Sequence, residues 1–238
     1  MSSPLTIVCP VYHEQDNIER TLDELRAKIQ TPHTTLIVYD KDDDPTVPVV
    51  ERLLPKHPDV KLLRNDLGRG VINAIKKGFQ TIPEDGVCLV VMADLSDDLI
   101  KVDTMYRLIE EMGYDLVCGS RYMRGGKQIG GPKLKGFLSR LAGVSLHALA
   151  SFPTRDATNA FRMYRARVLR AIPVESKGGF ELSLEITVKA WRAGFRIGEV
   201  PSIWRDRTAG ESRFRMWAWL PSYLKWYCLA FRSRCGGR

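Results

Sequence analysis

The chain has 238 residues, of which 44% are hydrophobic, and its formal net charge is +8. This length allows one large α/β domain or two small ones with a real core. No window reaches the roughly 18 uncharged apolar residues of a membrane-spanning helix, and the N-terminus lacks the charged leader of a signal peptide. The five cysteines show neither a CxxC pair nor a zinc spacing. We therefore expect reduced thiols and a cytoplasmic location.

Strand-like and helix-like segments alternate through the first 120 residues. In chain order we predict a strand at 5–9, a helix at 17–29, a strand at 35–39, a helix through 49–54, a strand at 60–63, a loop and helix at 68–79, a strand at 87–92, a helix at 102–112 and a strand at 115–119. Such alternation predicts a parallel sheet with helices on both faces, whose ligands gather at the C-terminal ends of the strands.

Polar clusters follow three of these predicted strands, at residues 12–14, 40–44 and 94–98. The last cluster places three carboxylates within five positions after two β-branched residues. Such carboxylates repel one another, and a hard divalent cation completed by substrate phosphates would relieve the repulsion. Asp97 and Asp98 are also good residues for the start of a helix, so a metal site and a helix cap both stay open.

Positive charge is concentrated in the second half of the chain. No acidic residue occurs from Leu116 to Arg155, a stretch that carries seven Lys and Arg residues. Such a block predicts an anionic partner: nucleic acid, a membrane surface or a phosphorylated ligand. The acidic strand ends and the lack of a nucleic-acid-binding motif argue against nucleic acid. We therefore expect a phosphorylated ligand.

The chain after residue 120 changes in character. A Gly/Lys-rich loop leads to an apolar helix at 138–152, and residues 213–238 are rich in Trp, Tyr and Arg. We predict a catalytic domain at 1–212 and an aromatic, basic segment at 213–238 that lies in the membrane interface. Pro221 and Lys225 argue against a membrane span, and a C-terminal helix packed on the core is the alternative.

Ordered motifs resemble those of inverting family-2 nucleotide-sugar glycosyltransferases. Residues 10–14 resemble their PTYNE-like opening, 38–44 their VDD-type strand end and 94–96 their DxD metal site. Four later motifs, at 119–126, 155–162, 179–181 and 206–213, follow in the order of the dolichol-phosphate mannose synthase group. The resemblance covers nearly the whole chain and implies a GT-A-type, Rossmann-like α/β fold with a mostly parallel central sheet. Met92 stands where the family has the first acid of DxD.

The resemblance also implies roles for particular residues. Asp94 would be the main ligand of Mg²⁺ or Mn²⁺, with Ser96 beside it. The nucleotide sugar would contact Pro10, Tyr12, Glu14, Asp40, Ala93, Asp94 and Arg207. The phosphate of a lipid acceptor would contact Arg121, Lys135 and Ser139. The residues expected to act in catalysis are Asp94, Arg121 and Arg207.

The implied reaction is inverting transfer of a hexose, mannose or glucose first, from a GDP or UDP sugar to a polyprenyl or dolichyl phosphate. It would occur on the cytoplasmic face of the membrane, by a peripheral enzyme; a membrane-protein partner or a homo-oligomer stays open. A phosphate monoester has a second pKa of about 6, so it needs positioning more than a general base.

Two alternatives remain at this stage. A glycan or small hydroxylated acceptor would need a carboxylate base, for which Asp156 and Glu181 are the candidates. Asp156 could instead form a structural ion pair with Arg162. A non-catalytic nucleotide-binding relative is the other alternative, and Met92 in place of an acid keeps it open.

Overall fold

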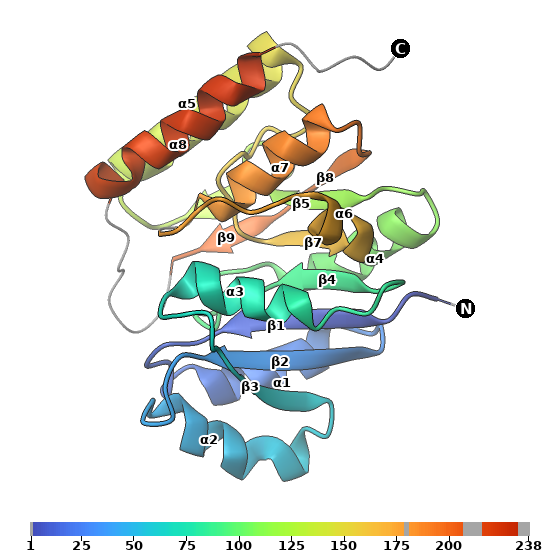
Figure 1. The fold of residues 1–238 in the computed structure, drawn as a ribbon, viewed down its shortest axis with the longest axis vertical. Helices are drawn as coiled ribbons and strands as arrows, with labels where there is room; N and C mark the ends of the chain where they lie inside the picture. Colours follow the sequence, from blue (N-terminus) through green and yellow to red (C-terminus); the bar gives the residue numbers. More distant parts are fainter. Residues whose placement is uncertain (1, 179–180, 207–215, 233–238) are drawn as a thin grey trace.

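A computed structural model describes residues 2–178, 181–206 and 216–232 (Figure 1). Its strands are β1 (Leu5–Pro10), β2 (His33–Tyr39), β3 (Val60–Arg64), β4 (Val87–Val90), β5 (Leu116–Ser120), β6 (Lys127–Ile129), β7 (Arg162–Arg165), β8 (Ile197–Pro201) and β9 (Ile203–Arg205). Its helices are α1 (Ile18–Lys28), α2 (Thr46–Leu53), α3 (Val71–Gln80), α4 (Val102–Glu110), α5 (Lys133–Ala150), α6 (Ala166–Ala171), α7 (Leu182–Arg192) and α8 (Met216–Phe231). Short 3₁₀ turns η1 (Leu54–Lys56) and η2 (Leu99–Lys101) precede β3 and α4. Every element predicted before residue 120 is present, with ends that differ by a few residues.

The main sheet has the strand order β3-β2-β1-β4-β7-β5-β8. All neighbours are parallel except β7, which runs antiparallel to both β4 and β5. The prediction of a mostly parallel sheet is therefore confirmed. Strand β7 was not predicted, because it begins and ends with arginine and lacks the apolar run of a buried strand. Arg162 is nevertheless fully buried, and its guanidinium donates to the Ser183 and Asp156 carbonyl oxygens.

Helices cover both faces of the sheet, as the alternation predicted (Figure 1). Helices α1, α2 and α4 bury their apolar faces in one cluster, which also takes Ile7 and Cys9 of β1. Helices α3, α6 and α7 pack on the opposite face. Side chains alternate between the two faces of a strand, and Val8 accordingly joins a cluster on the α3 side. Strand β1 is thus buried on both faces, between β2 and β4.

Helices α5 and α8 lie side by side and form an outer layer above α7 (Figure 1). Helix α5 starts at Lys133, not at residue 138 as predicted. On α8, Trp226 and Ala230 are each 2% exposed and join Leu146 and Trp191 in one cluster. The described part of the C-terminal segment therefore packs on the rest of the chain, as in the alternative kept open above; the boundary at residue 212 stays a prediction. Within the described ranges, no helix combines the length and apolar character needed to cross a bilayer.

Gly143 determines how closely α5 approaches the chain before β7. A Cβ atom at this position would lie 2.1 Å from the carbonyl oxygen of Arg155 and 3.2 Å from the Ala157 nitrogen. Both contacts are with backbone, which cannot move aside as a flexible side chain can. Glycine thus lets the middle of α5 rest on residues 155–157, and this contact brings the helix to the site described next.

Candidate functional site

The three predicted polar clusters lie at one edge of the sheet. Strand β1 pairs in parallel with β2 on one side and β4 on the other, so their C-terminal ends meet. Pro10 ends β1, and Ala93 follows β4 and accepts a hydrogen bond from Thr21 Oγ1 at 3.1 Å through its carbonyl oxygen. The Tyr12 side chain is 46% exposed, with its ring 4.4 Å from that of His13. Residues 12–14, 40–44 and 94–98 therefore border the same region.

The loop after β1 is held in a strained backbone conformation. His13 has φ +57°, and its N–H donates to the buried Asp44 carboxylate at 3.1 Å. The Glu14 N–H donates to Thr46 Oγ1 at 2.9 Å. Asn17 does not cap α1 with its side chain; its Nδ2 donates to Glu14 Oε2 at 2.8 Å. Glu14 is thus oriented by a neighbour, as a ligand-binding carboxylate would need to be.

Asp40 follows β2 and is held through both carboxylate oxygens. Asn65 Nδ2 donates to Oδ1 at 2.7 Å, and the Gly70 N–H donates to Oδ2 at 2.8 Å. Asn65 was not predicted as part of the site. The signal that selected the other residues, a polar side chain directly after a strand, would also have selected Asn65, since it follows β3.

A tight turn follows β4 at Asp94. The Ser96 N–H donates to Asp94 Oδ1 at 3.1 Å, and Leu95 between them has φ +60°. Asp98 Oδ2 accepts a hydrogen bond from the Ile203 N–H at 3.0 Å. Asp98 stands before η2 but makes no side-chain cap bond, so its carboxylate attaches the turn to β9.

Asp97 connects this turn back to the end of β4. Its Oδ2 accepts a hydrogen bond from the Met92 N–H at 3.0 Å. Burial raises the pKa of Asp97 to about 7; the Met92 N–H opposes this rise, and the carboxylates of Asp94 and Asp98 add to it. Mg²⁺ and Mn²⁺ prefer oxygen ligands, and such a cation at this turn would offset the repulsion among the three carboxylates.

A metal at this turn would not be held by the protein alone. Within residues 2–178, 181–206 and 216–232, no group of three or more Asp, Glu, His or Cys side chains is arranged to hold a metal ion. Mg²⁺ commonly binds through one or two carboxylates together with substrate phosphates. The residues fit a cation that Asp94 and Ser96 share with a phosphorylated ligand.

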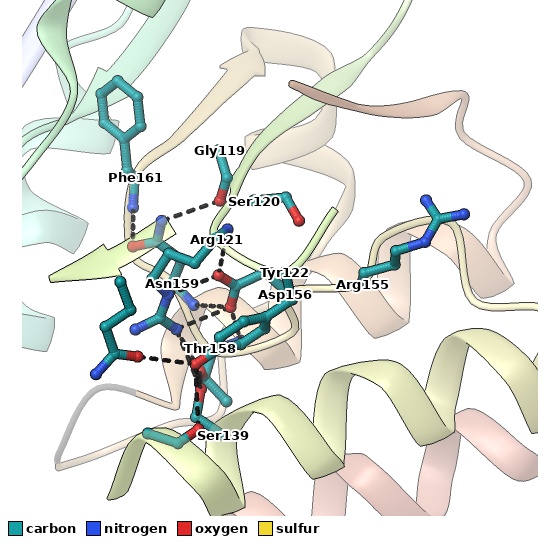
Figure 2. Close-up of polar contacts among 12 residues, drawn as sticks. Gly119, Ser120, Arg121, Tyr122, Ser139, Arg155, Asp156, Thr158, Asn159 and Phe161 are labelled. Atoms are coloured by element: carbon teal, nitrogen blue, oxygen red, sulfur yellow. Dashed lines mark hydrogen bonds and ion pairs between the residues drawn. The ribbon is translucent and has the colours of Figure 1, made fainter. Parts of the chain in front are cut away.

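Arg121 and Asp156 form a buried ion pair beyond the end of β5 (Figure 2). Arg121 Nε donates to Oδ2 at 2.7 Å, Nη2 donates to Oδ1 at 2.9 Å, and the Arg121 N–H donates to Oδ2 at 3.0 Å. Asp156 is fully buried, as its 0% exposure shows. Burial opposes its ionisation, but the Arg121 guanidinium outweighs this and keeps the pKa of Asp156 below its usual value.

Three hydroxyl groups surround the Arg121 guanidinium. Nη2 donates to Ser139 Oγ at 3.1 Å and to Thr158 Oγ1 at 2.9 Å. The two hydroxyl oxygens are 2.5 Å apart, and Tyr122 OH donates to Ser139 Oγ at 2.8 Å. The structure thus brings the predicted Arg121 and Ser139 together and adds Tyr122 and Thr158. Hydroxyl groups can rotate to donate to an anion, so this cluster suits phosphate oxygens.

Other predicted residues have different outcomes. Lys135 lies one helical turn before Ser139 on α5 and is half-buried. Arg207 lies outside the described residues. The ion pair between Asp156 and Arg162 that the sequence left open does not form, because the Asp156 carboxylate pairs with Arg121. Arg162 instead donates to the carbonyl oxygen of Asp156, at 2.9 Å.

We expect Asp156→Asn to destabilise the fold by about 3 kcal/mol or more, because it leaves a buried guanidinium without its charge partner. Denaturant unfolding of the two proteins would measure this. Asp43→Asn is the control, since the Asp43 side chain is 79% exposed and removing its charge should cost about 0.5 kcal/mol or less.

The stability lost in Asp156→Asn should depend on pH. The pKa of Asp156 is lowered in the folded chain, so its ionised form stabilises the fold above the unfolded pKa of about 3.9. This contribution is lost as the pH falls through the folded pKa. The stability difference between wild type and Asp156→Asn should therefore be full at neutral pH and shrink in acid. An equal difference at pH 7 and at about pH 2 would contradict the assignment.

Comparisons with known proteins identify the family of the chain. The model of the glycosyl transferase family 2 matches residues 6–172. An undecaprenyl-phosphate mannosyltransferase of Micrococcus luteus is 32% identical over 214 residues, which cover 88% of this chain and 86% of the relative. A dolichol-phosphate mannosyltransferase of Pyrococcus furiosus is 26% identical over 216 residues, 89% of this chain but 59% of the relative.

Solved structures show the same fold. A mannosyltransferase of Pyrobaculum calidifontis, in complex with GDP-Man and Mn²⁺, matches with a TM-score of 0.67 at 16% identity, over 100% of this chain and 66% of that one. A glucosyl-3-phosphoglycerate synthase of Mycobacterium tuberculosis, with Mn²⁺ and UDP, matches with a TM-score of 0.68 at 14% identity, over 99% of this chain and 81% of that one. These likenesses confirm the predicted GT-A-type fold. The extent of the family match and the identity to the Micrococcus enzyme show that this chain is a glycosyltransferase and belongs to glycosyl transferase family 2.

Proposed function

We propose that this glycosyltransferase transfers a hexose, mannose or glucose first, from a nucleoside-diphosphate sugar to a polyprenyl phosphate. The observation that carries the proposal is the position of the Arg121 cluster, formed by Arg121, Asp156, Tyr122, Ser139 and Thr158. Ser139 belongs to α5, so the cluster lies directly against this helix. The outer side of this helix is apolar and exposed. A polyprenyl phosphate has the matching chemistry, an anionic head on an apolar chain. The names of the Micrococcus and Pyrococcus relatives, both polyprenol-phosphate mannosyltransferases, support the same acceptor class.

The donor would bind at the ends of β1, β2 and β4. Asp94 and Ser96 would hold Mg²⁺ or Mn²⁺, which when bound neutralises charge on the diphosphate. Tyr12, Glu14 and Asp40 would contact the nucleoside, with Pro10 and Ala93 lining the same region and Arg207 binding the diphosphate. The GDP-Man and UDP complexes of the fold neighbours support a nucleotide-linked donor without deciding between the two bases.

The reaction would be a single displacement at the anomeric carbon. An oxygen of the acceptor phosphate forms the new bond to C1 of the sugar, and the bond from C1 to the diphosphate oxygen breaks. The electron pair leaves with the nucleoside diphosphate, and the configuration at C1 inverts. Arg121, Lys135 and Ser139 would orient the attacking phosphate, which carries no proton that must be removed when it is a dianion.

The Asp156 carboxylate supports a phosphate acceptor over a hydroxyl acceptor. A hydroxyl group needs a carboxylate base within hydrogen-bond reach. Both Asp156 oxygens already accept from Arg121, and this pairing keeps the pKa of Asp156 low. A carboxylate held in this way is a weak base. Glu181 is the other candidate for a base, because it is buried and burial raises its pKa.

The outer side of α5 supports a membrane-surface position. Leu134, Phe137 and Leu141 recur at helical spacing and are 55%, 63% and 55% exposed. Leu224 on the neighbouring α8 is 50% exposed. We propose that this face rests on the cytoplasmic surface of the membrane, where the head of a polyprenyl phosphate would reach Arg121. The free thiols of Cys9, Cys88, Cys118 and Cys228 are compatible with that reducing side.

A sugar-transfer assay tests the function. Radiolabelled GDP- and UDP-sugars are incubated with the protein, polyprenyl phosphate and Mg²⁺ or Mn²⁺. We expect label in the organic phase with one donor, and Asp94→Asn to lower this rate about a hundredfold or more with little change in stability. The control is Asp23→Asn on α1, whose side chain is 67% exposed. Label only in a water-soluble product would contradict the lipid acceptor, and unchanged turnover by Asp94→Asn would remove its metal role.

Acceptor contacts are tested separately from donor contacts. Lys135→Ala and Ser139→Ala should each raise the KM for polyprenyl phosphate about tenfold, because each removes a hydrogen-bond donor to the acceptor phosphate. The KM for the nucleotide sugar should stay nearly unchanged. Lys133→Ala is the control on the same helix, since residues two apart do not share a face. A change confined to the donor KM would reject the assignment.

Vesicle binding tests the membrane surface. Phe137→Asp and Leu141→Asp should each weaken co-sedimentation with phosphatidylcholine and phosphatidylglycerol vesicles about tenfold, since each removes an apolar side chain worth about 1.5–3 kcal/mol when buried. Met112→Asp is the control: this side chain is also 55% exposed but follows α4. Equal loss in all three variants, or none, would reject α5 as the contact.

A further inference from the structure

Asn65 links the end of β2 to the loop that leads into α3. Its side chain is buried, with Nδ2 donating to Asp40 Oδ1 and to the Gly68 carbonyl oxygen, both at 2.7 Å. Its Oδ1 accepts from the Leu67 N–H at 3.0 Å, and its own N–H donates to the Tyr39 carbonyl oxygen at 2.8 Å. The carboxamide thus has partners for both donor hydrogens and for its oxygen.

The Asp40 carboxylate can accept further hydrogen bonds beyond the two that the protein donates to it. Asp40 is half-buried and accepts one bond at each oxygen, from Asn65 and from the Gly70 N–H. Each carboxylate oxygen can accept two hydrogen bonds. With the two protein donors in place, the plane of the carboxylate is set, and it can accept two more bonds. Paired N–H or O–H donors of a nucleobase or ribose match this capacity.

The loop from residue 65 to 70 has a conformation that depends on these bonds. Gly68 and Gly70 have φ +97° and +117°, values that side-chain-bearing residues rarely adopt. Gly68 is held by Asn65, and Gly70 by Asp40. Asp40, Asn65 and the loop therefore form one hydrogen-bonded unit, in which Asn65 joins the other two.

We propose that Asn65 is a positioning residue for the donor nucleoside. It holds the Asp40 carboxylate and the 65–70 loop in the arrangement that receives the base or ribose, and it acts through Asp40 without touching the nucleotide. This inference rests on the proposed function, in which Asp40 contacts the donor. Asparagine suits the position because it donates to a carboxylate; aspartate there would place two carboxylates in contact.

Nucleotide binding by the full chain tests the inference. Affinities for GDP, UDP and inorganic pyrophosphate are measured by calorimetry in the presence of Mg²⁺. Asn65→Ala should weaken binding of the nucleotide that wild type prefers about tenfold, or 1.4 kcal/mol, and leave pyrophosphate binding unchanged. In turnover the donor KM should rise and the acceptor KM should not. Asp23→Asn is the control: it removes a carboxylate on α1 that is 67% exposed and leaves Asp40 and the 65–70 loop untouched.

A double-mutant cycle separates positioning from general loosening of the fold. Because Asn65 acts through Asp40, Asp40→Asn with Asn65→Ala should bind nucleotide no more weakly than Asp40→Asn alone. Additive losses, or equal losses for nucleotide and pyrophosphate, would overturn the inference. Unchanged nucleotide affinity in Asn65→Ala would overturn it and leave the proposed function standing. Wild type that binds neither GDP nor UDP would overturn both.

Discussion

The buried pair of Arg121 and Asp156 joins the parts of the chain that make up the acceptor side. Arg121 follows β5, Asp156 precedes β7, and the Ser139 hydroxyl reaches the same guanidinium from α5. Neither charge is stable there alone, since separating a buried pair costs about 3–5 kcal/mol. The close approach of α5 at Gly143 supports the same contact from the backbone side. This interaction therefore helps to fix the position of α5, and hence of its exposed apolar face.

The antiparallel strand β7 brings the two sides of the site to one edge. Strand β7 opposes both β4 and β5, so these two strands point the same way although they are not neighbours. The turn after β4 and the arginine after β5 therefore lie at the same edge of the sheet. The charge of Arg121 is close enough to oppose the raised pKa of Asp97. A donor bound at Asp94 and an acceptor bound at Arg121 could thus meet, which two strands of opposite direction would not allow.

Sequence patterns could predict the elements of the first half because each is apolar with a clear period. They also placed the acidic strand ends correctly, since parallel neighbours bring their C-terminal ends together. They missed β7, because Arg162 satisfies its charge through carbonyl oxygens that only the folded chain supplies. For the same reason they offered Arg162, and not Arg121, as a possible ion-pair partner of Asp156. A partner six residues away is visible in a sequence, whereas one 35 residues away depends on the fold.

The proposed acceptor side has little net charge, because its arginine is paired with a carboxylate. Because Asp156 neutralises Arg121, a phosphate beside this pair meets a nearly neutral group and three hydroxyls, not a free cation. The hydroxyl groups can orient a phosphate monoester, but they cannot balance its two negative charges. In the proposed complex with the acceptor, Lys135, one turn before Ser139 on α5, would supply the compensating charge. The pair would then fix geometry while the lysine supplies attraction, so removing the lysine should weaken acceptor binding without disturbing the cluster that Asp156 holds together.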